Sequence, residues 1–130
     1  MYQALRFARL WLLGGLLLML LVLLLMLLPL GELPVDELLD DKDAHLLVFG
    51  LLMLWFGGVF RPRTLPAVAA GLLAFGALIE VLQGLLPYRS AEFADLLFDA
   101  GGIVLGWALA VAGLRHWTRW IEAGLAAGES

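Results

Sequence analysis

The sequence predicts an all-α, polytopic membrane protein with four transmembrane helices and both termini in the cytoplasm. The first observation behind this prediction is composition. Of the 130 residues, 63% are hydrophobic and only 15% are charged, whereas soluble globular domains are about 45 to 50% apolar. A surface with so little charge is expected to face lipid. The length is that of one domain, so residues 1–130 are predicted to form a single four-helix transmembrane domain.

The second observation is the spacing of the apolar stretches. A hydrocarbon core of about 30 Å requires about 20 apolar residues per helix. Four stretches meet this requirement, at residues 10–28, 44–60, 65–86 and 96–114. The first carries no charge and lacks the small-residue cleavage site of a signal peptide, so it is expected to remain in the mature protein. The second is expected to end at Pro62 and the third before Pro87, because proline interrupts a helix.

The end of the chain has a different pattern. Residues 96–114 carry Asp99 near their start but are otherwise apolar, and they are followed by the sequence HWTRWIEAGLAAGES at residues 116–130. This tail is compatible with an amphipathic helix along the inner membrane surface. The alternative is a frayed terminus.

The third observation is the distribution of positive charge, because cytoplasmic loops of membrane proteins retain Lys and Arg. In a four-helix topology, only Lys42 and Arg89 fall on one side of the membrane. The other six basic residues fall on the opposite side: Arg6, Arg9, Arg61, Arg63, Arg115 and Arg119. This asymmetry predicts that both termini are cytoplasmic.

The composition also excludes several classes of function. The chain has no cysteine, so disulfides, thiolate nucleophiles and thiolate metal sites are excluded. The net charge is −4 at pH 7, and no basic surface of the kind that binds nucleic acid is present. Nucleic acid is therefore not expected as a partner, and no cofactor is predicted. A homo-oligomer is left open.

Five polar residues interrupt the apolar helices near their outer ends: His45, Glu80, Gln83, Asp95 and Asp99. Residues three or four apart share a helix face, and a rise of about 1.5 Å per residue places all five at similar depth. A charge that faces lipid costs at least about 2.5 to 3.5 kcal/mol, so each side chain is expected to turn inward. Five such groups at one depth favour an outward-facing polar pocket that binds a ligand.

Two cations lie beside this group in the predicted topology and complete the predicted ligand-binding set: Lys42, His45, Glu80, Gln83, Arg89, Asp95 and Asp99. The alternative is a structural network that only holds the four helices in register.

A metal would have to draw its ligands from His45, Glu80, Asp95 and Asp99. No contiguous ligand motif supports a metal and the two cations would repel it, so none is predicted.

Small residues continue the polar face of the fourth helix. Asp95, Asp99, Gly102 and Gly106 fall along one stripe, and the two glycines form a small-xxx-small pattern that lets helix backbones approach closely. We expect this stripe to face the second and third helices.

Three blocks of residues follow one another at defined spacing: Asp41-Lys42-x-x-His45-x-x-x-Phe49, Glu80-x-x-Gln83-x-x-x-Pro87-x-Arg89, and Asp95-x-x-x-Asp99-x-x-Gly102-x-x-x-Gly106. In this order they resemble the VanZ-like family of small bacterial membrane proteins, named for a protein associated with resistance to the glycopeptide antibiotic teicoplanin. The resemblance implies a multi-pass protein of the bacterial inner (cytoplasmic) membrane with a cell-envelope role, including reduced teicoplanin susceptibility. It implies nothing firm about catalysis.

One position departs from the family pattern. The family typically has asparagine where this sequence has Asp99. If Asp99 is ionised, the pocket is more acidic than in the family and prefers a cation or a protonated partner. If it is neutral, it can donate a hydrogen bond as the amide would.

Three functions follow from these residues. The favoured one is a non-enzymatic protein whose pocket binds membrane lipids, lipid-linked envelope precursors or a lipophilic glycopeptide. The second is a membrane enzyme acting on a lipid-linked substrate, with catalytic candidates His45, Glu80 and Asp95 in acid and base roles; the sequence has no recognisable nucleophile motif. The third, a transporter or proton pathway, is disfavoured because the inner halves of the helices carry no polar residue.

Overall fold

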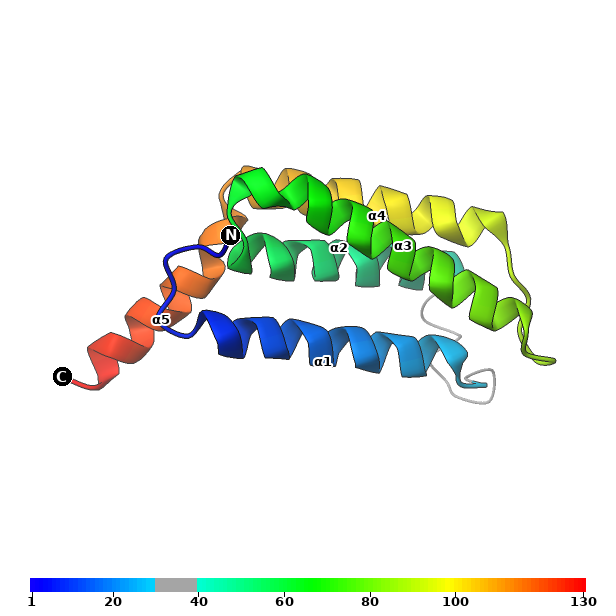
Figure 1. Cartoon of the computed structure of the whole chain (residues 1–130), viewed down its shortest axis with the longest axis horizontal. Helices are drawn as coiled ribbons and strands as arrows, with labels where there is room; N and C mark the ends of the chain where they lie inside the picture. The colour runs from blue at the N-terminus through cyan, green and yellow to red at the C-terminus, as the bar shows by residue number, and fades with distance from the viewer. Residues whose placement is uncertain (30–39) are drawn as a thin grey trace.

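The computed structural model describes residues 1–29 and 40–130, and this part of the chain is helical. Four long helices run side by side, and a shorter one leaves the bundle at the end where both termini lie (Figure 1). In chain order the elements are α1 (Ala8–Leu27), α2 (Asp41–Val59), the 3-10 turn η3 (Pro62–Thr64), α3 (Leu65–Gly84), α4 (Phe93–Val111), the 3-10 turn η4 (Leu114–His116) and α5 (Trp117–Gly128). Each of the four long helices is long and apolar enough to cross a membrane. The prediction of an all-α protein with four transmembrane helices is therefore confirmed.

The helix ends lie within three residues of the predicted ones. The second helix begins at Asp41 rather than at residue 44, so that Asp41 and Asp43 occupy its first turn. Carboxylates there interact favourably with the positive end of the helix dipole. The third helix ends at Gly84 rather than at residue 86.

Of the two alternatives left open for residues 116–130, the structure has the helix, α5, and its position at the membrane surface is untested. Between α4 and α5 the backbone turns at Gly113, whose φ of 130° is readily adopted only by glycine. This turn directs α5 away from the bundle axis (Figure 1).

Helix α2 is the centre of the bundle and contacts α1, α3 and α4. One face of α2 is buried and carries large apolar side chains, among them Phe49, Leu52 and Met53. By contrast, α1 is buried along only a narrow stripe and presents leucines such as Leu17 outward. The core is thus built around α2, and the outer faces of the other helices have the apolar character that lipid contact requires.

The backbones of α2 and α4 approach each other closely through glycines on both helices. A Cβ atom on Gly102 would collide with the carbonyl oxygen of Leu46, and one on Gly106 would collide with the carbonyl oxygen of Gly50. In the opposite direction, a Cβ on Gly50 would lie 3.3 Å from the Gly102 oxygen. The expected packing of the Asp95–Gly106 stripe against α2 is confirmed. Its contact with α3 is made by Asp99, which lies against Gly76.

Three tryptophans pack together at the end of the bundle where the termini lie. Trp11 of α1, Trp55 of α2 and Trp117 of α5 form mutual ring contacts, with centroid separations of 6.0, 5.2 and 5.0 Å. The Trp55 indole donates a hydrogen bond to the Trp11 carbonyl oxygen at 3.0 Å. Gly58 makes room for the Trp117 ring, because a side chain there would overlap the indole. This tryptophan cluster joins helices from both ends of the chain.

Glu122 of α5 adds a polar link at the same end. Its carboxylate accepts hydrogen bonds from the backbone N–H groups of Arg6 and Phe7, at 2.8 and 3.0 Å, and from the Trp11 indole at 2.8 Å. The N–H groups at the start of α1 thereby obtain a partner that the local sequence does not supply. Burial raises the pKa of the Glu122 carboxyl, but the hydrogen bonds from Phe7, Trp11 and Arg6 outweigh it and leave the pKa below its ordinary value.

Replacing Gly102 or Gly106 with alanine should destabilise the bundle, because the new methyl group would meet the backbone of α2 rather than a side chain that can move. Overpacking of this kind typically costs about 1 to 3 kcal/mol. The loss is measured as a lower melting temperature and a lower folded yield in detergent.

The matched control is Gly71→Ala, since a Cβ at Gly71 of α3 meets nothing within 4 Å. This variant should melt at or above the wild-type temperature, because alanine favours helix more than glycine does. Equal melting temperatures for all three variants would contradict the close approach of α2 and α4.

Replacing Glu122 with glutamine should lower the melting temperature, because the hydrogen bonds to the start of α1 lose their charged acceptor. Loss of a helix cap costs about 1 kcal/mol. The folded-state pKa lies below the ordinary value of 4.5, so the stabilisation is present above that value and is lost as the pH falls through the lowered pKa. The difference in melting temperature between wild type and E122Q should therefore shrink on acidification. Glu129→Gln is the control, since Glu129 makes only an exposed ion pair with Arg6.

Candidate functional site

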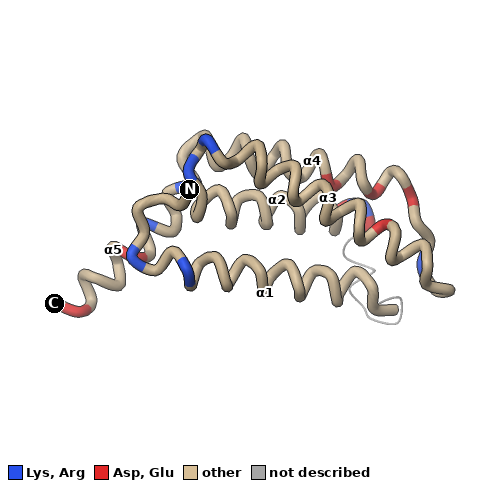
Figure 2. The backbone as a smooth tube through the Cα atoms, in the orientation of Figure 1, with Lys and Arg blue, Asp and Glu red and all other residues tan. Residues whose placement is uncertain are grey.

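The polar residues of α2, α3 and α4 gather at the end of the bundle opposite the termini. Figure 2 shows acidic positions of α3 and α4 near this end, while most Lys and Arg positions lie at the termini end. Five side chains at this polar end are buried and are named here the polar cluster: His45, Glu80, Gln83, Asp95 and Asp99. The expectation that these side chains turn inward is met by all five.

The centre of the polar cluster is a hydrogen bond between His45 of α2 and Asp99 of α4. His45 Nδ1 and Asp99 Oδ1 lie 2.6 Å apart, and both side chains are fully buried. A carboxylate at this distance favours a proton on Nδ1. The other ring nitrogen, Nε2, is then free to accept a hydrogen bond or bind a cation. The imidazole lies parallel to the Phe49 ring, one turn along α2, with 6.4 Å between the ring centroids.

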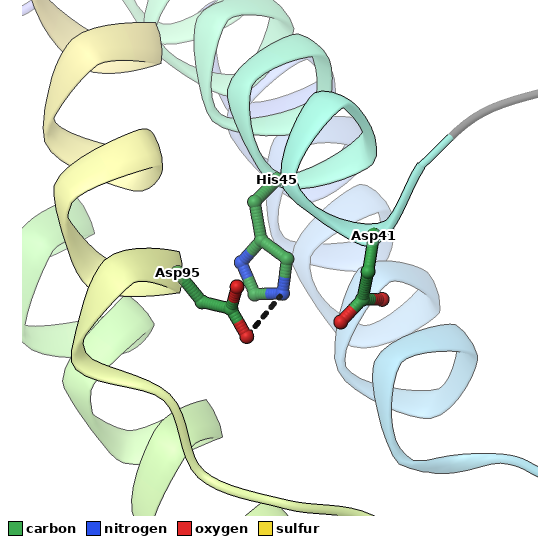
Figure 3. Close-up of side chains that lie close together, drawn as sticks. All are labelled: Asp41, His45 and Asp95. Atoms are coloured by element: carbon green, nitrogen blue, oxygen red, sulfur yellow. Dashed lines mark ion pairs between the residues drawn. The ribbon is translucent and has the colours of Figure 1, made fainter.

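Asp95 lies on the other side of the imidazole. Its Oδ2 atom is 4.0 Å from His45 Nε2 (Figure 3). Asp95 is in the first turn of α4, where the helix dipole favours a carboxylate. Its Oδ1 atom has no hydrogen-bond partner among residues 1–29 and 40–130.

Glu80 and Gln83 are oriented by contacts to other segments. Glu80 Oε2 accepts a hydrogen bond from the backbone N–H of Glu92 at 3.0 Å, which fixes the connection that leads into α4. Gln83 Nε2 donates to the carbonyl oxygen of Met26 at 2.9 Å. The other carboxylate oxygen of Glu80, Oε1, is buried and has no hydrogen-bond partner in the described part of the chain. The same is true of the side-chain oxygen of Gln83, Oε1.

Like Gln83, Tyr88 and Arg89 donate hydrogen bonds to carbonyl groups at the end of α1. Arg89 Nη2 donates to the Leu28 carbonyl oxygen at 2.6 Å, and the Tyr88 hydroxyl donates to the Leu27 carbonyl oxygen at 2.8 Å. The final carbonyls of a helix have no partner within it. Together with Gln83, these two residues therefore hold the end of α1 in place.

The rim of the site consists of two ion pairs. Lys42 Nζ lies 3.1 Å from Glu92 Oε2, and Arg89 Nη1 lies 3.7 Å from Asp41 Oδ1. Asp41 and Glu92 are about half exposed, whereas Arg89 is 18% exposed. Lys42 and Arg89 thus form ion pairs with more exposed carboxylates, and neither makes an ion pair with His45, Asp95 or Asp99 among the described residues.

Sequence reasoning missed three residues of this region: Asp41, Tyr88 and Glu92. Asp41 opens the first block of the family resemblance, which could have indicated it, but it was not among the residues predicted to bind a ligand. Nothing in the sequence indicated Glu92, which precedes the predicted fourth helix. Its contacts with Glu80 and Lys42 depend on how the connection between α3 and α4 folds.

Several buried polar atoms of the site have no hydrogen-bond partner among the described residues. The buried side-chain atoms without a hydrogen-bond partner among the described residues are His45 Nε2, Glu80 Oε1, Gln83 Oε1, Arg89 Nε, Asp95 Oδ1 and Asp99 Oδ2. All six belong to the polar end of the bundle, and four of them are oxygens that can only accept unless a carboxyl is protonated. Buried polar groups without partners are rare and each requires an explanation. A donor or a cation from outside the chain would supply one.

A family model described as VanZ/LLP1 matches residues 40–115. The match covers more than half of the chain, from the start of α2 to the turn after α4. The chain belongs to the VanZ/LLP1 family. Searches among the curated proteins and among the solved structures found no match.

The part of the chain shared with the VanZ/LLP1 family contains the whole polar cluster and both cations of its rim. Helices α1 and α5 lie outside it, although they supply the carbonyl groups and the carboxylate that tie the bundle together. The seven residues predicted to bind a ligand are therefore all in the shared part. Gln83 and Arg89 in addition hold α1, and the ligand-binding role of the set stays a prediction.

The departure from the family pattern at Asp99 can be tested by restoring asparagine. Asp99→Asn keeps the shape of the side chain and an oxygen that accepts from His45 Nδ1, so the fold should survive with a small change in melting temperature. Asp99→Leu leaves His45 without its partner, and an unpaired buried donor costs about 1 to 3 kcal/mol. Thermal unfolding in detergent compares the two. Equal destabilisation by Asn and Leu would show that the hydrogen bond contributes nothing.

Proposed function

We propose that the polar cluster and its rim bind the polar head of a membrane lipid or of a lipid-linked envelope precursor. The observation that carries this proposal is the set of buried, unpartnered atoms at one end of a membrane-spanning bundle. Their burial within an apolar protein requires compensation, because a polar group without a partner costs about 1 to 3 kcal/mol. The charge and polarity of the site define the chemistry of the ligand.

The ligand should carry both negative charge and hydrogen-bond donors. Glu80 Oε1 and Gln83 Oε1 are acceptors, so they suit hydroxyl, amine or ammonium groups. Lys42 and Arg89 lie at the rim and can contact a phosphate or carboxylate. A phosphorylated headgroup that also carries an amine or hydroxyl combines both features. Sugar-bearing envelope precursors and lipophilic glycopeptides share this chemistry.

The small extramembrane part of the chain limits the partner to the membrane and its surface. Among the described residues, the segments outside the four spans are short connections and α5. We place the polar end at the outer face of a bacterial inner membrane, with both termini cytoplasmic, because the basic residues concentrate at the termini end (Figure 2). Membership of the VanZ/LLP1 family supports a cell-envelope role, and a site of this chemistry is compatible with reduced teicoplanin susceptibility.

A membrane enzyme acting on a lipid-linked substrate is the second candidate. It is favoured by one observation, the Asp99–His45 hydrogen bond, which orients the imidazole and leaves Nε2 free. A histidine held in this way can act as a general base. Asp95 is 4.0 Å from Nε2 and Glu80 lies on the neighbouring helix, so both remain candidates for acid or base roles.

Lipid binding can be tested by native mass spectrometry of the protein from membranes of two compositions. Phosphatidylethanolamine and phosphatidylcholine carry the same phosphate, but the trimethylammonium group of the latter has no N–H donor. The wild type should retain phosphatidylethanolamine several-fold better than phosphatidylcholine. Lys42→Gln should weaken retention of both lipids, because the rim loses a cation. Arg63→Gln at the termini end is the control and should change neither.

Equal retention of the two lipids, unchanged in K42Q, would contradict the proposal. The same spectra separate binding from catalysis. Turnover would produce a lipid of altered mass in the wild type that is absent in His45→Gln, whereas pure binding would leave every lipid mass intact.

A further inference from the structure

We propose that Asp41, His45 and Asp95 form a binding site for a divalent transition metal ion, with Zn²⁺ as the best-matched probe. One ligand atom from each residue lies within 4.8 Å of the other two. Figure 3 shows the three side chains directed into one space, with the imidazole between the two carboxylates. A nitrogen and two oxygens are a donor set that zinc accepts.

The free atoms of two buried side chains point to a cation at this place. His45 Nε2 and Asp95 Oδ1 are buried and have no hydrogen-bond partner among the residues that the structure describes. His45 is fully buried and Asp95 is 2% exposed. A cation between the two side chains would satisfy His45 Nε2 and, bound by both oxygens of the carboxylate, would satisfy Asp95 Oδ1 as well.

The charge balance of the polar end leads to the same conclusion. Of the carboxylates there, Glu92 pairs with Lys42 and Asp41 with Arg89. Asp99 is hydrogen-bonded to the His45 imidazole, and Glu80 accepts a hydrogen bond from a backbone N–H. Among the described residues, the contact recorded for the Asp95 carboxylate is the one with the imidazole, at 4.0 Å. A buried carboxylate without a close partner is strongly disfavoured, so a proton or a bound cation must compensate it.

The Asp99–His45 hydrogen bond orients the imidazole so that Nε2 can bind a metal. Metal-binding histidines usually donate their second ring N–H to a carboxylate or carbonyl, which fixes the tautomer and orients the ring. Asp99 Oδ1, 2.6 Å from Nδ1, occupies this position and leaves the Nε2 lone pair directed toward Asp95. Asp99 would thus position the ligand without touching the ion.

Small movements would complete the site. Zinc bonds of about 2.0 to 2.1 Å place tetrahedral ligand atoms roughly 3.3 Å apart. The separations of 4.0 Å between His45 and Asp95, and up to 4.8 Å within the set, are somewhat larger. Asp41 is exposed and its contact with Arg89 is long, at 3.7 Å, so its carboxylate is free to move inward. Three protein ligands would leave one position open for water or a phosphate oxygen.

This site differs from the metal set considered from sequence, which lacked Asp41 and included Glu80. Lys42 and Arg89 were both expected to repel a metal, but in the structure Lys42 is paired with Glu92 and Arg89 with Asp41. The zinc proposal rests on these three side chains and not on the binding of a lipid.

The test uses the full chain purified in detergent without added lipid, stripped with a chelator and equilibrated with buffered Zn²⁺. Zinc per chain is measured by elemental analysis, and zinc affinity by titration calorimetry. We expect one zinc per chain and a higher melting temperature with zinc present. Asp95→Asn and Asp41→Asn should weaken zinc binding by at least about 10-fold, and Asp99→Asn should weaken it by about 10- to 100-fold as a positioning residue.

Asp43→Asn is the matched control, because Asp43 is in the same first turn of α2 as Asp41 but outside the triad. It should bind zinc as the wild type does. If Asp95→Asn does not fold, Asp41→Asn decides the question, since Asp41 is exposed and its replacement should leave the fold intact. Absence of bound zinc in the wild type, or equal zinc affinity in the Asp41 and Asp43 variants, would overturn the proposal.

Discussion

The close contact between the α2 and α4 backbones brings the buried polar groups of these two helices within hydrogen-bonding distance. Gly102 and Gly106 allow the two helices to approach so closely that carbonyl oxygens of α2 occupy the space a side chain would need. At this separation the imidazole of His45 reaches the carboxylate of Asp99 within 2.6 Å. A larger residue in the stripe would push the helices apart and leave both groups buried without partners. The packing and the chemistry of the polar end therefore depend on the same glycines.

Helix α1 illustrates a second constraint, which is that backbone groups at membrane helix ends need partners. Many of its leucines face outward, because leucine is as compatible with lipid as with protein. Besides the packing of Trp11, Val22 and Met26, polar side chains from elsewhere hold the helix at both ends. Glu122 accepts from the N–H groups at its start, while Gln83 and Arg89 donate to the carbonyls at its end. Two residues near the candidate site thus have a structural contact in addition to the ligand role proposed for them.

The sequence was sufficient to predict the four spans and the inward direction of the polar cluster. Hydropathy and length determine a membrane helix, and residues three or four apart, such as Asp95 and Asp99, must share a face. The sequence did not indicate the partners made by tertiary contact. Every helix has unpaired terminal carbonyls, so nothing in the pattern showed that Arg89 would reach those of α1. Asp41 was missed because the second helix begins earlier than its apolar run suggests, which carries that carboxylate toward His45.

The hydrogen bonds of Glu122 connect residues separated by more than 110 positions in sequence. Because α1 precedes α5 in the chain, the start of α1 is synthesised well before its acceptor. Until α5 has been made, the N–H groups of Arg6 and Phe7 have to bond to water. The closure of the bundle at that end therefore follows the synthesis of all four spans.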